Sequence, residues 1–258
     1  PLSEALAEGM IELEVIAEGG HTGKSLKLRV RNLQRKKWTL QVPAGFIFEA
    51  PDTSIQDLIN IQTRVLALDK KGSRTTYLYG MCIEAHNSSP AEGRTYRARG
   101  IAQGKLLQLA GYLDEQRIRD YAAQDAIWAV TNGHEISHIG NAGLQRFTAR
   151  LLGRPLPGYT IEHGSRVAVP EQGPAFVPDP VVVRGEFRFR AEEALSATFG
   201  LYNEAGERLL TLFEAQDRPA GQHRFKFYFE LDELPPGRYF ARLTDAEGLT
   251  LEELEVNL

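Results

Sequence analysis

The feature that most constrains the fold of this chain is a proline-rich stretch at residues 154–181. It holds six of the chain's 13 prolines, at Pro155, Pro157, Pro170, Pro174, Pro178 and Pro180. Proline lacks a backbone N–H and fixes φ, so such a stretch favours neither a regular helix nor a central strand. We therefore expect a semi-rigid linker that separates two folding units, 1–153 and 182–258.

The first hundred residues have the pattern of β-strands. Several segments alternate apolar and polar residues or are rich in β-branched and aromatic ones, and turn sequences such as PAG and KKGS separate them. The expected strands are 11–17, 25–33, 37–43, 60–69 and 75–85. Strict alternation along 25–33 indicates that one face is buried and the other is solvated, as in an antiparallel sandwich.

From about residue 101 to 152 the apolar period changes to that of helices. One stripe runs from Leu106 to Leu113, and a second contains Tyr121, Gln124, Ile127 and Trp128. Asn132-Gly133 is a plausible end for this second helix, and a third short helix is expected over 142–152. The fold class predicted for the first unit is therefore a β-sandwich with a helical insertion.

The segment 182–258 predicts seven or so short strands. Turns are expected at Asn203–Gly206 and at Leu234–Gly237, between alternating segments. The order of LYNEAGERLLTL, HRFKF and LPPGRYFARL resembles the immunoglobulin-like modules of flagellar hook-capping proteins and of the C-terminal ends of secreted Bacteroidetes proteins. The resemblance implies an immunoglobulin-like β-sandwich and leaves its ligand open.

Charge and hydropathy narrow the range of partners. The formal net charge is −4, with basic residues scattered among acidic ones, which argues against nucleic acid. Two short basic turns, QRKK at 34–37 and KKGSR at 70–74, are interpreted as solvated. No apolar run reaches the ~18 residues that a membrane span needs. The single cysteine excludes an internal disulfide, and nothing indicates a cofactor.

Cys82 and Gln124 are the first candidate site. Cys82 lies in the expected strand 75–85, and Gln124 brings an uncharged amide onto an apolar helical face, where it needs hydrogen-bond partners. One interpretation is structural: the amide bonds nearby backbone, and Cys82 is a small buried apolar residue.

A second interpretation comes from a resemblance. The segment Ala123-Gln124-Asp125-Ala126-Ile127-Trp128, some forty residues after a cysteine in a β-rich domain, resembles the T-Q-x-A motif in thioester domains of bacterial surface adhesins. Ala123 stands where that family has Thr. The resemblance implies an internal thioester from Cys82, with Gln124 as the candidate acyl partner and Tyr121, Ile127 and Trp128 as the supporting face. In the family, the acyl glutamine lies in a later strand, so the sequence leaves open which glutamine reacts.

The second candidate site is a zinc site in the sequence His134-Glu135-Ile136-Ser137-His138. On a helix, His134 and His138 would share a face and could bind zinc while Glu135 activates water. Helix breakers at Gly133 and Gly140 argue against a helix of that length.

Together these patterns predict a secreted or cell-surface, non-enzymatic, adhesin-like protein whose partner is a protein or a host- or cell-surface ligand. A zinc metallopeptidase and a structural spacer without active chemistry are the alternatives.

Overall fold

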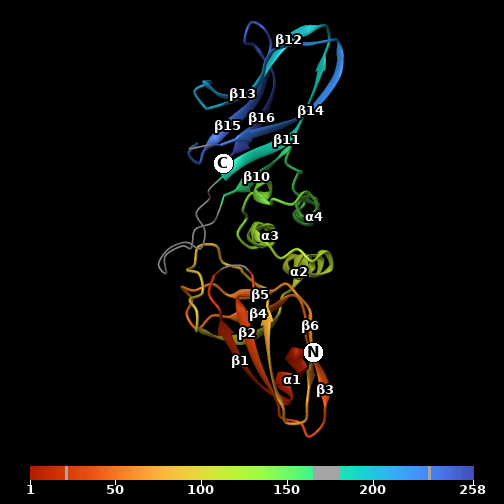
Figure 1. The fold of residues 1–258 in the computed structure, drawn as a ribbon, viewed down its shortest axis with the longest axis vertical. Helices are drawn as coiled ribbons and strands as arrows, with labels where there is room; N and C mark the ends of the chain where they lie inside the picture. The colour runs from red at the N-terminus through yellow and green to blue at the C-terminus, as the bar shows by residue number, and fades with distance from the viewer. Residues whose placement is uncertain (21–22, 165–179, 232–233) are drawn as a thin grey trace. The chain divides into compact units, whose positions relative to one another are not determined.

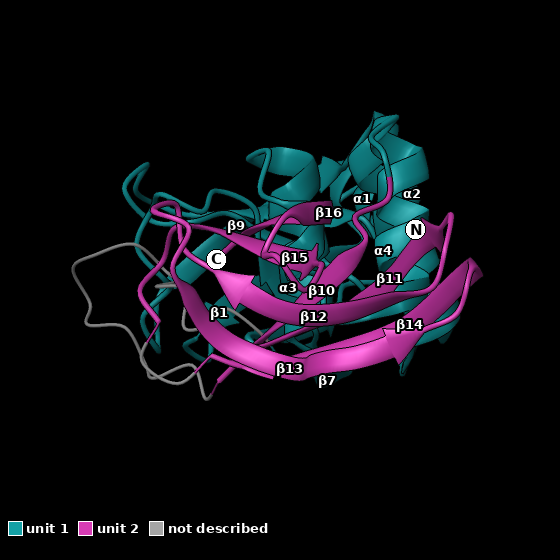
Figure 2. Ribbon diagram, turned by 90° about the horizontal axis from the view of Figure 1, so that it is seen from above, with its two compact units in different colours: residues 1–155, 167–177 teal, residues 156–166, 178–258 magenta. Residues whose placement is uncertain are grey.

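The protein is described from a computed structural model that covers residues 1–20, 23–164, 180–231 and 234–258. The chain divides into two compact units (Figure 2). Unit 1 contains Pro1–Pro155, and unit 2 begins at Leu156 and takes in Pro178–Leu258. Each unit has its own hydrophobic core and is described by itself.

Unit 1 is built mainly of β-strands. Its elements up to residue 101 are α1 (Leu2–Ala7), β1 (Ile11–Ala17), β2 (Leu26–Asn32), β3 (Trp38–Val42), β4 (Phe46–Glu49), β5 (Leu58–Asn60), β6 (Arg64–Leu68), β7 (Ser73–Leu78), β8 (Gly80–Cys82) and β9 (Thr95–Ile101) (Figure 1). Among the described residues, seven strands form one sheet in the order β7-β2-β1-β9-β4-β5-β8, and β3 pairs with β6. The alternating burial of β2 matches the alternation in its sequence.

The two edges of this sheet are consecutive in the chain. β7 pairs with β2, β8 pairs with β5, and only Tyr79 separates β7 from β8. The prediction of a single strand over 75–85 is therefore wrong, because the segment changes its pairing partner from β2 to β5 at Tyr79. The sheet closes on itself through residues 73–82, around a core that includes Leu28, Phe46 and Phe48.

Three α-helices follow the sheet, as the apolar period predicts. They are α2 (Gly104–Gln116), α3 (Tyr121–Thr131) and α4 (Ala142–Leu152), with the short 3₁₀ helix η1 (Ile136–His138) between the last two. They pack against Ile59, Met81 and neighbouring residues in a second apolar cluster. None of the helices in the described part of the chain combines the length and hydropathy that a membrane crossing needs.

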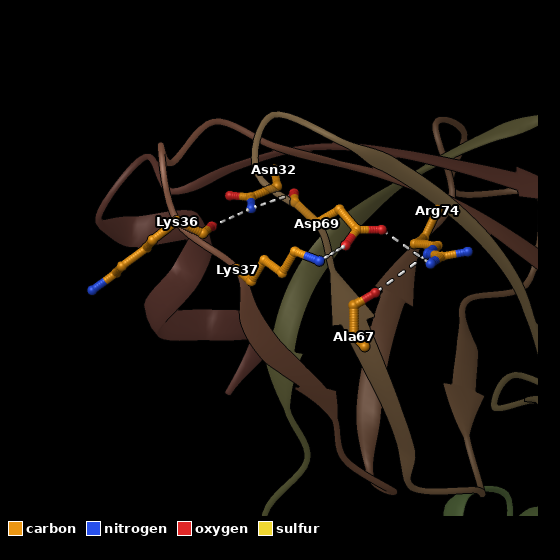
Figure 3. Close-up of polar contacts among 6 residues, drawn as sticks. All are labelled: Asn32, Lys36, Lys37, Ala67, Asp69 and Arg74. Carbon is orange, nitrogen blue, oxygen red and sulfur yellow. Dashed lines mark hydrogen bonds and ion pairs between the residues drawn. The ribbon is translucent and has the colours of Figure 1, made fainter.

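A buried asparagine ties two loops of unit 1 together (Figure 3). The Asn32 side chain, which is 0% exposed, donates from Nδ2 to the carbonyl oxygens of Lys36 at 3.0 Å and Asp69 at 2.8 Å. Its Oδ1 accepts from the Gln34 backbone N–H at 2.8 Å and from the Trp38 indole at 2.9 Å. The β2–β3 loop and the β6–β7 loop are thereby held side by side.

Unit 2 is a sandwich of two sheets. Its strands are β10 (Tyr159–His163), β11 (Pro180–Ala191), β12 (Leu195–Tyr202), β13 (Arg208–Arg218), β14 (Gly221–Glu230), β15 (Arg238–Thr244) and β16 (Thr250–Asn257). They form sheets in the orders β10-β11-β14 and β13-β12-β15-β16. Phe199 lies in the shared core, where its ring packs edge-on against Phe187 and Phe225.

This strand order is that of an immunoglobulin-like fold. The first, second and fifth strands make one sheet, and the fourth, third, sixth and seventh make the other, which corresponds to A-B-E and C′-C-F-G. Tyr239, at the start of β15, donates its hydroxyl to the Pro235 carbonyl oxygen at 2.8 Å. This is the tyrosine corner that such domains place at the start of the sixth strand. The mainly β fold class with a helical insertion is confirmed.

The expectation that all of 154–181 is a linker is wrong at β10, which is an edge strand of unit 2. This strand contains no proline and, among the described residues, pairs with β11 alone, at the edge of its sheet. An edge position tolerates neighbouring prolines, since few of the backbone donors there are needed. Residues 165–179 of the expected linker lie outside the described residues.

Candidate functional site

Cys82 is the last residue of β8, and its side chain is fully buried. Along residues 79–83, the main-chain groups of the odd-numbered residues point toward β5. The Tyr79 carbonyl oxygen accepts from the Ile61 N–H at 2.9 Å, and the Ile83 N–H donates to Asp57 O at 3.1 Å. The main chain of Cys82 therefore faces away from β5. On that other side, Gly80 O accepts from Ser25 Oγ at 2.9 Å, just before β2 begins. Among the residues that the structure describes, β8 has no strand partner on that side beyond Gly80.

Gln124 takes the place of the missing strand. Its Oε1 accepts from the Cys82 backbone N–H at 2.9 Å, and its Nε2 donates to the Cys82 carbonyl oxygen at 2.8 Å. A side-chain carboxamide has the same donor and acceptor as a peptide group, so it completes the ladder. The structure thus joins the two predicted site residues directly, although they are 42 positions apart.

The local sequence explains how α3 presents this amide. Asp120 caps the helix by accepting from the Ala122 N–H at 3.1 Å, and all residues from Ala122 to Ala129 are buried. Ile127 packs in the apolar cluster that contains Met81, whereas Trp128 packs in the one that contains Cys82. The helix therefore lies between two cores.

Tyr121 does not belong to the buried face that the sequence predicts. It is 42% exposed, since it is the first residue of α3 and precedes the buried run. At the other end of the helix, Asn132 Oδ1 accepts from the Ala85 N–H at 3.2 Å. The sequence indicates only a helix end at Asn132, whereas in the structure this residue also holds the segment after Cys82.

The environment of Cys82 keeps its thiol protonated. Burial, followed by the nearby Glu84 carboxylate, raises the pKa of Cys82 well above its ordinary value. Because the thiolate is the nucleophilic form, Cys82 is unreactive toward external reagents in this state. Any acyl transfer to sulfur would have to be internal.

Glu84 is a titratable group that the sequence analysis missed. Its Oε2 accepts from the Asp57 N–H at 2.7 Å, and Asp57 is itself paired with Arg99 at 3.0 Å. Burial raises the pKa of Glu84 to about 7, against the lowering effect of the Asp57 N–H. The loops that carry these residues are joined: Ser88 N–H donates to Ser54 O at 2.9 Å.

We expect Glu84 to make the stability of unit 1 fall as pH rises. Its ordinary pKa of 4.5 lies below its folded pKa of about 7, so the unfolded state loses the proton first and stability declines across that window. A Glu84→Gln variant should match wild type at pH 4.5 and be more stable at pH 8 by about 1 kcal/mol, after allowance for solvent screening.

Urea unfolding followed by tryptophan fluorescence measures this difference, because both tryptophans, Trp38 and Trp128, lie in unit 1. Burial, then the neighbouring His86, lowers the pKa of His134, which gives an opposite slope below its ordinary value of 6.5. The quantity to compare is therefore the difference in the free energy of unfolding between variant and wild type at each pH. The exposed Glu92→Gln variant is the control, and equal pH profiles for Glu84→Gln and wild type would contradict the expectation.

The sequence His134–His138 is not one helix. Only Ile136–His138 is helical, as the 3₁₀ helix η1, with Glu135 in extended conformation before it. The His134 ring lies 5.6 Å from the Trp128 ring, centroid to centroid, and is half-buried. Among the described residues, no three His, Cys, Asp or Glu side chains are grouped so that they could hold a metal ion. The helical face that the zinc hypothesis requires is absent from this segment.

Comparisons with known proteins add little to this geometry. No family model matches the sequence, and no curated protein matches it significantly. Among solved structures, a β-glucosidase from Kluyveromyces marxianus is similar at 10% sequence identity, with a TM-score of 0.21. The alignment covers 90% of this chain and 44% of that one, so this chain spans less than half of the enzyme's length. A similarity at this level carries no argument about fold or activity.

Proposed function

We propose that the chain is a secreted or cell-surface binding protein of the adhesin type, which acts by contact rather than by turnover. In this proposal unit 1 is a thioester-type domain with Cys82 as its thiol, and unit 2 is an immunoglobulin-like module that serves as a spacer or docking surface. The observation that supports it most is the paired hydrogen bonding of Gln124 to Cys82.

The proposed chemistry has two balanced steps. The Cys82 sulfur attacks the carbonyl carbon of a glutamine side chain, the C–N bond breaks, and the thiol proton leaves with ammonia. A lysine amine of the partner then attacks the thioester, which forms an amide and restores the thiol. Burial of the sulfur supports this proposal, because a buried thioester is protected from water before the partner makes contact.

Gln124 is the candidate acyl partner, and a thioester at Gln124 could form only if one of its hydrogen bonds to Cys82 breaks. The amide nitrogen, which would leave as ammonia, donates to the Cys82 carbonyl oxygen, so the reaction must give up that bond. If another glutamine supplies the acyl group, Gln124 serves instead to hold Cys82 in place. The experiment has to separate these two roles.

Intact mass of freshly purified protein is the test. One thioester lowers the mass by about 17 Da, the loss of one ammonia. Methylamine should then open the bond, expose the thiol to maleimide and leave the acyl glutamine about 14 Da heavier than an ordinary glutamine. Peptide mapping of that label identifies the glutamine directly.

The Cys82→Ala variant is the matched control, and it should show neither the mass loss nor the methylamine label. A label on Gln124 assigns it as the acyl partner, and a label elsewhere assigns it a holding role. An unmodified mass in the exported protein, with or without a maleimide-reactive thiol, would overturn the covalent part of the proposal.

Two observations favour a second candidate, a structural module without active chemistry. Both polar atoms of Gln124 are satisfied by backbone, and burial raises the pKa of Cys82, as expected for a core residue. The unmodified mass described above, together with a thiol that resists maleimide until the protein unfolds, would select this candidate.

A further inference from the structure

The structure brings together two basic turns that are far apart in the sequence. The β2–β3 loop and the β6–β7 loop lie side by side, and we call residues 34–37 and 69–74 the basic loop pair (Figure 3). Six of these ten residues are Lys or Arg and one is Asp, in a chain whose formal net charge is −4. The six cationic residues, Arg35, Lys36, Lys37, Lys70, Lys71 and Arg74, are all exposed.

The loops are fixed in place despite the repulsion between like charges. Beside the bonds of Asn32, the Lys71 N–H donates to Gln34 O at 3.2 Å, and the Lys71 ammonium donates to Leu33 O. Asp69 is shared by Lys37 at 3.1 Å and Arg74 at 3.2 Å. One carboxylate therefore neutralises part of the charge, and within the described part of the chain Arg35, Lys36 and Lys70 form no ion pair.

The conformation of Lys71 supports a role for this charge. Its φ is +51°, in the left-handed region that glycine adopts most easily. A lysine at such a turn position is uncommon. Glycine would suit this backbone conformation better than lysine does. The lysine instead adds a positive charge and a hydrogen bond from its ammonium to the neighbouring loop.

We propose that the basic loop pair binds a sulfated polysaccharide. Rigid clusters of exposed Lys and Arg attract polyanions electrostatically and gain affinity by releasing counterions. The site is independent of Cys82 and adds a second, non-covalent mode of binding to the proposed function.

Residue chemistry favours a glycan over the other polyanions. None of the ten residues is aromatic, and the adjacent Trp38 is only partly exposed, so the loops themselves offer no ring for base stacking. None of the ten is a large apolar residue that could enter a lipid surface. The partner that fits is highly anionic and hydrophilic throughout.

Calorimetry with heparin as the probe tests the proposal. The variant Arg35→Gln/Lys36→Gln/Lys70→Gln removes three charges that form no ion pair with any described residue. The matched control, Lys24→Gln/Arg97→Gln/Lys105→Gln, removes three exposed charges elsewhere in unit 1. At 0.15 M salt we expect the first variant to bind about tenfold or more weakly and with a smaller salt slope, and the control to bind as wild type does.

Further arms identify the ligand class and separate this site from Cys82. Desulfated heparin should bind much more weakly than heparin, and the Cys82→Ala variant should bind heparin as wild type does. The proposal is overturned if heparin does not bind, if both triple variants lose affinity equally, or if desulfated heparin binds as tightly as heparin. It is also overturned if oligo-dT or phosphatidylserine vesicles bind as tightly as heparin.

Discussion

Replacement of Gln124 by leucine should lower the free energy of unfolding of unit 1 by about 3–5 kcal/mol, because two backbone groups would be buried without partners. The Cys82 N–H and C=O bond to Gln124 alone on that side of β8, and the Gln124 side chain is 0% exposed. Leucine fills a similar volume, so loss of the hydrogen bonds dominates the effect. Urea unfolding followed by tryptophan fluorescence measures it.

Two variants make this expectation specific. Gln108→Leu, on the exposed side of α2, should change stability by less than about 0.5 kcal/mol. Gln124→Glu should be least stable at pH 8 and recover as pH falls, because a protonated carboxyl accepts from the Cys82 N–H and donates to its carbonyl as the amide does. A loss below 1 kcal/mol for Gln124→Leu, or a pH-independent Gln124→Glu variant, would show that the pairing is not what holds β8.

Replacement of Asn32 by alanine should cost about 3 kcal/mol, since four hydrogen bonds of ordinary strength are lost at once. Lys36 O and Asp69 O lose their donor, and Gln34 N–H and the Trp38 indole lose their acceptor. Trp38 emission should change at the same time, because its N–H is left without this acceptor. The same urea titration reports both effects.

The Asn87→Ala variant is the control for Asn32. Asn87 makes a side-chain bond of 3.0 Å to Thr53 O in an exposed setting, so its removal should cost less than about 1 kcal/mol. If the two variants lose equal stability, the idea that Asn32 is a buried hub is wrong. Heparin affinity of the Asn32→Ala variant should also fall, as the basic loop pair loses its fixed geometry.

Local sequence patterns predict the helices and strands of this fold well, but they predict poorly which strands pair with each other. The alternation in β2 and the helical period of α3 follow from residue spacing alone. The change of partner at Tyr79 does not, because it depends on where β2 begins. Gly80 carries a signal: a Cβ there would lie 2.6 Å from Ser25 Oγ, and a glycine inside a strand often marks such a close approach.

The candidate site shows the same limit. The apolar neighbours of Gln124 indicate that its amide is buried and must be satisfied, but the partner lies 42 residues away and no spacing rule identifies it. Only the family resemblance linked the two segments. Glu84 gave no signal, since an acid at the end of a strand usually lies in solvent, and here the Asp57 loop covers it. The prolines on both sides of β10 hide its strand pattern, because they predict a linker for the whole stretch.

The closed sheet of unit 1 also determines the order in which the chain can fold. The β1–β2 hairpin is local and needs only the first 32 residues, but Val15 pairs with Tyr96, and β4 pairs with β9 across a long loop. Pairing of distant segments costs loop-closure entropy before the new contacts stabilise the chain, and such topologies therefore fold slowly. During synthesis, β7 covers the outer edge of β2, but β1, β4 and β5 each keep one exposed edge until β8 and β9 have been made. α3 is made after all of these strands, and Gln124 then covers the remaining edge at Cys82.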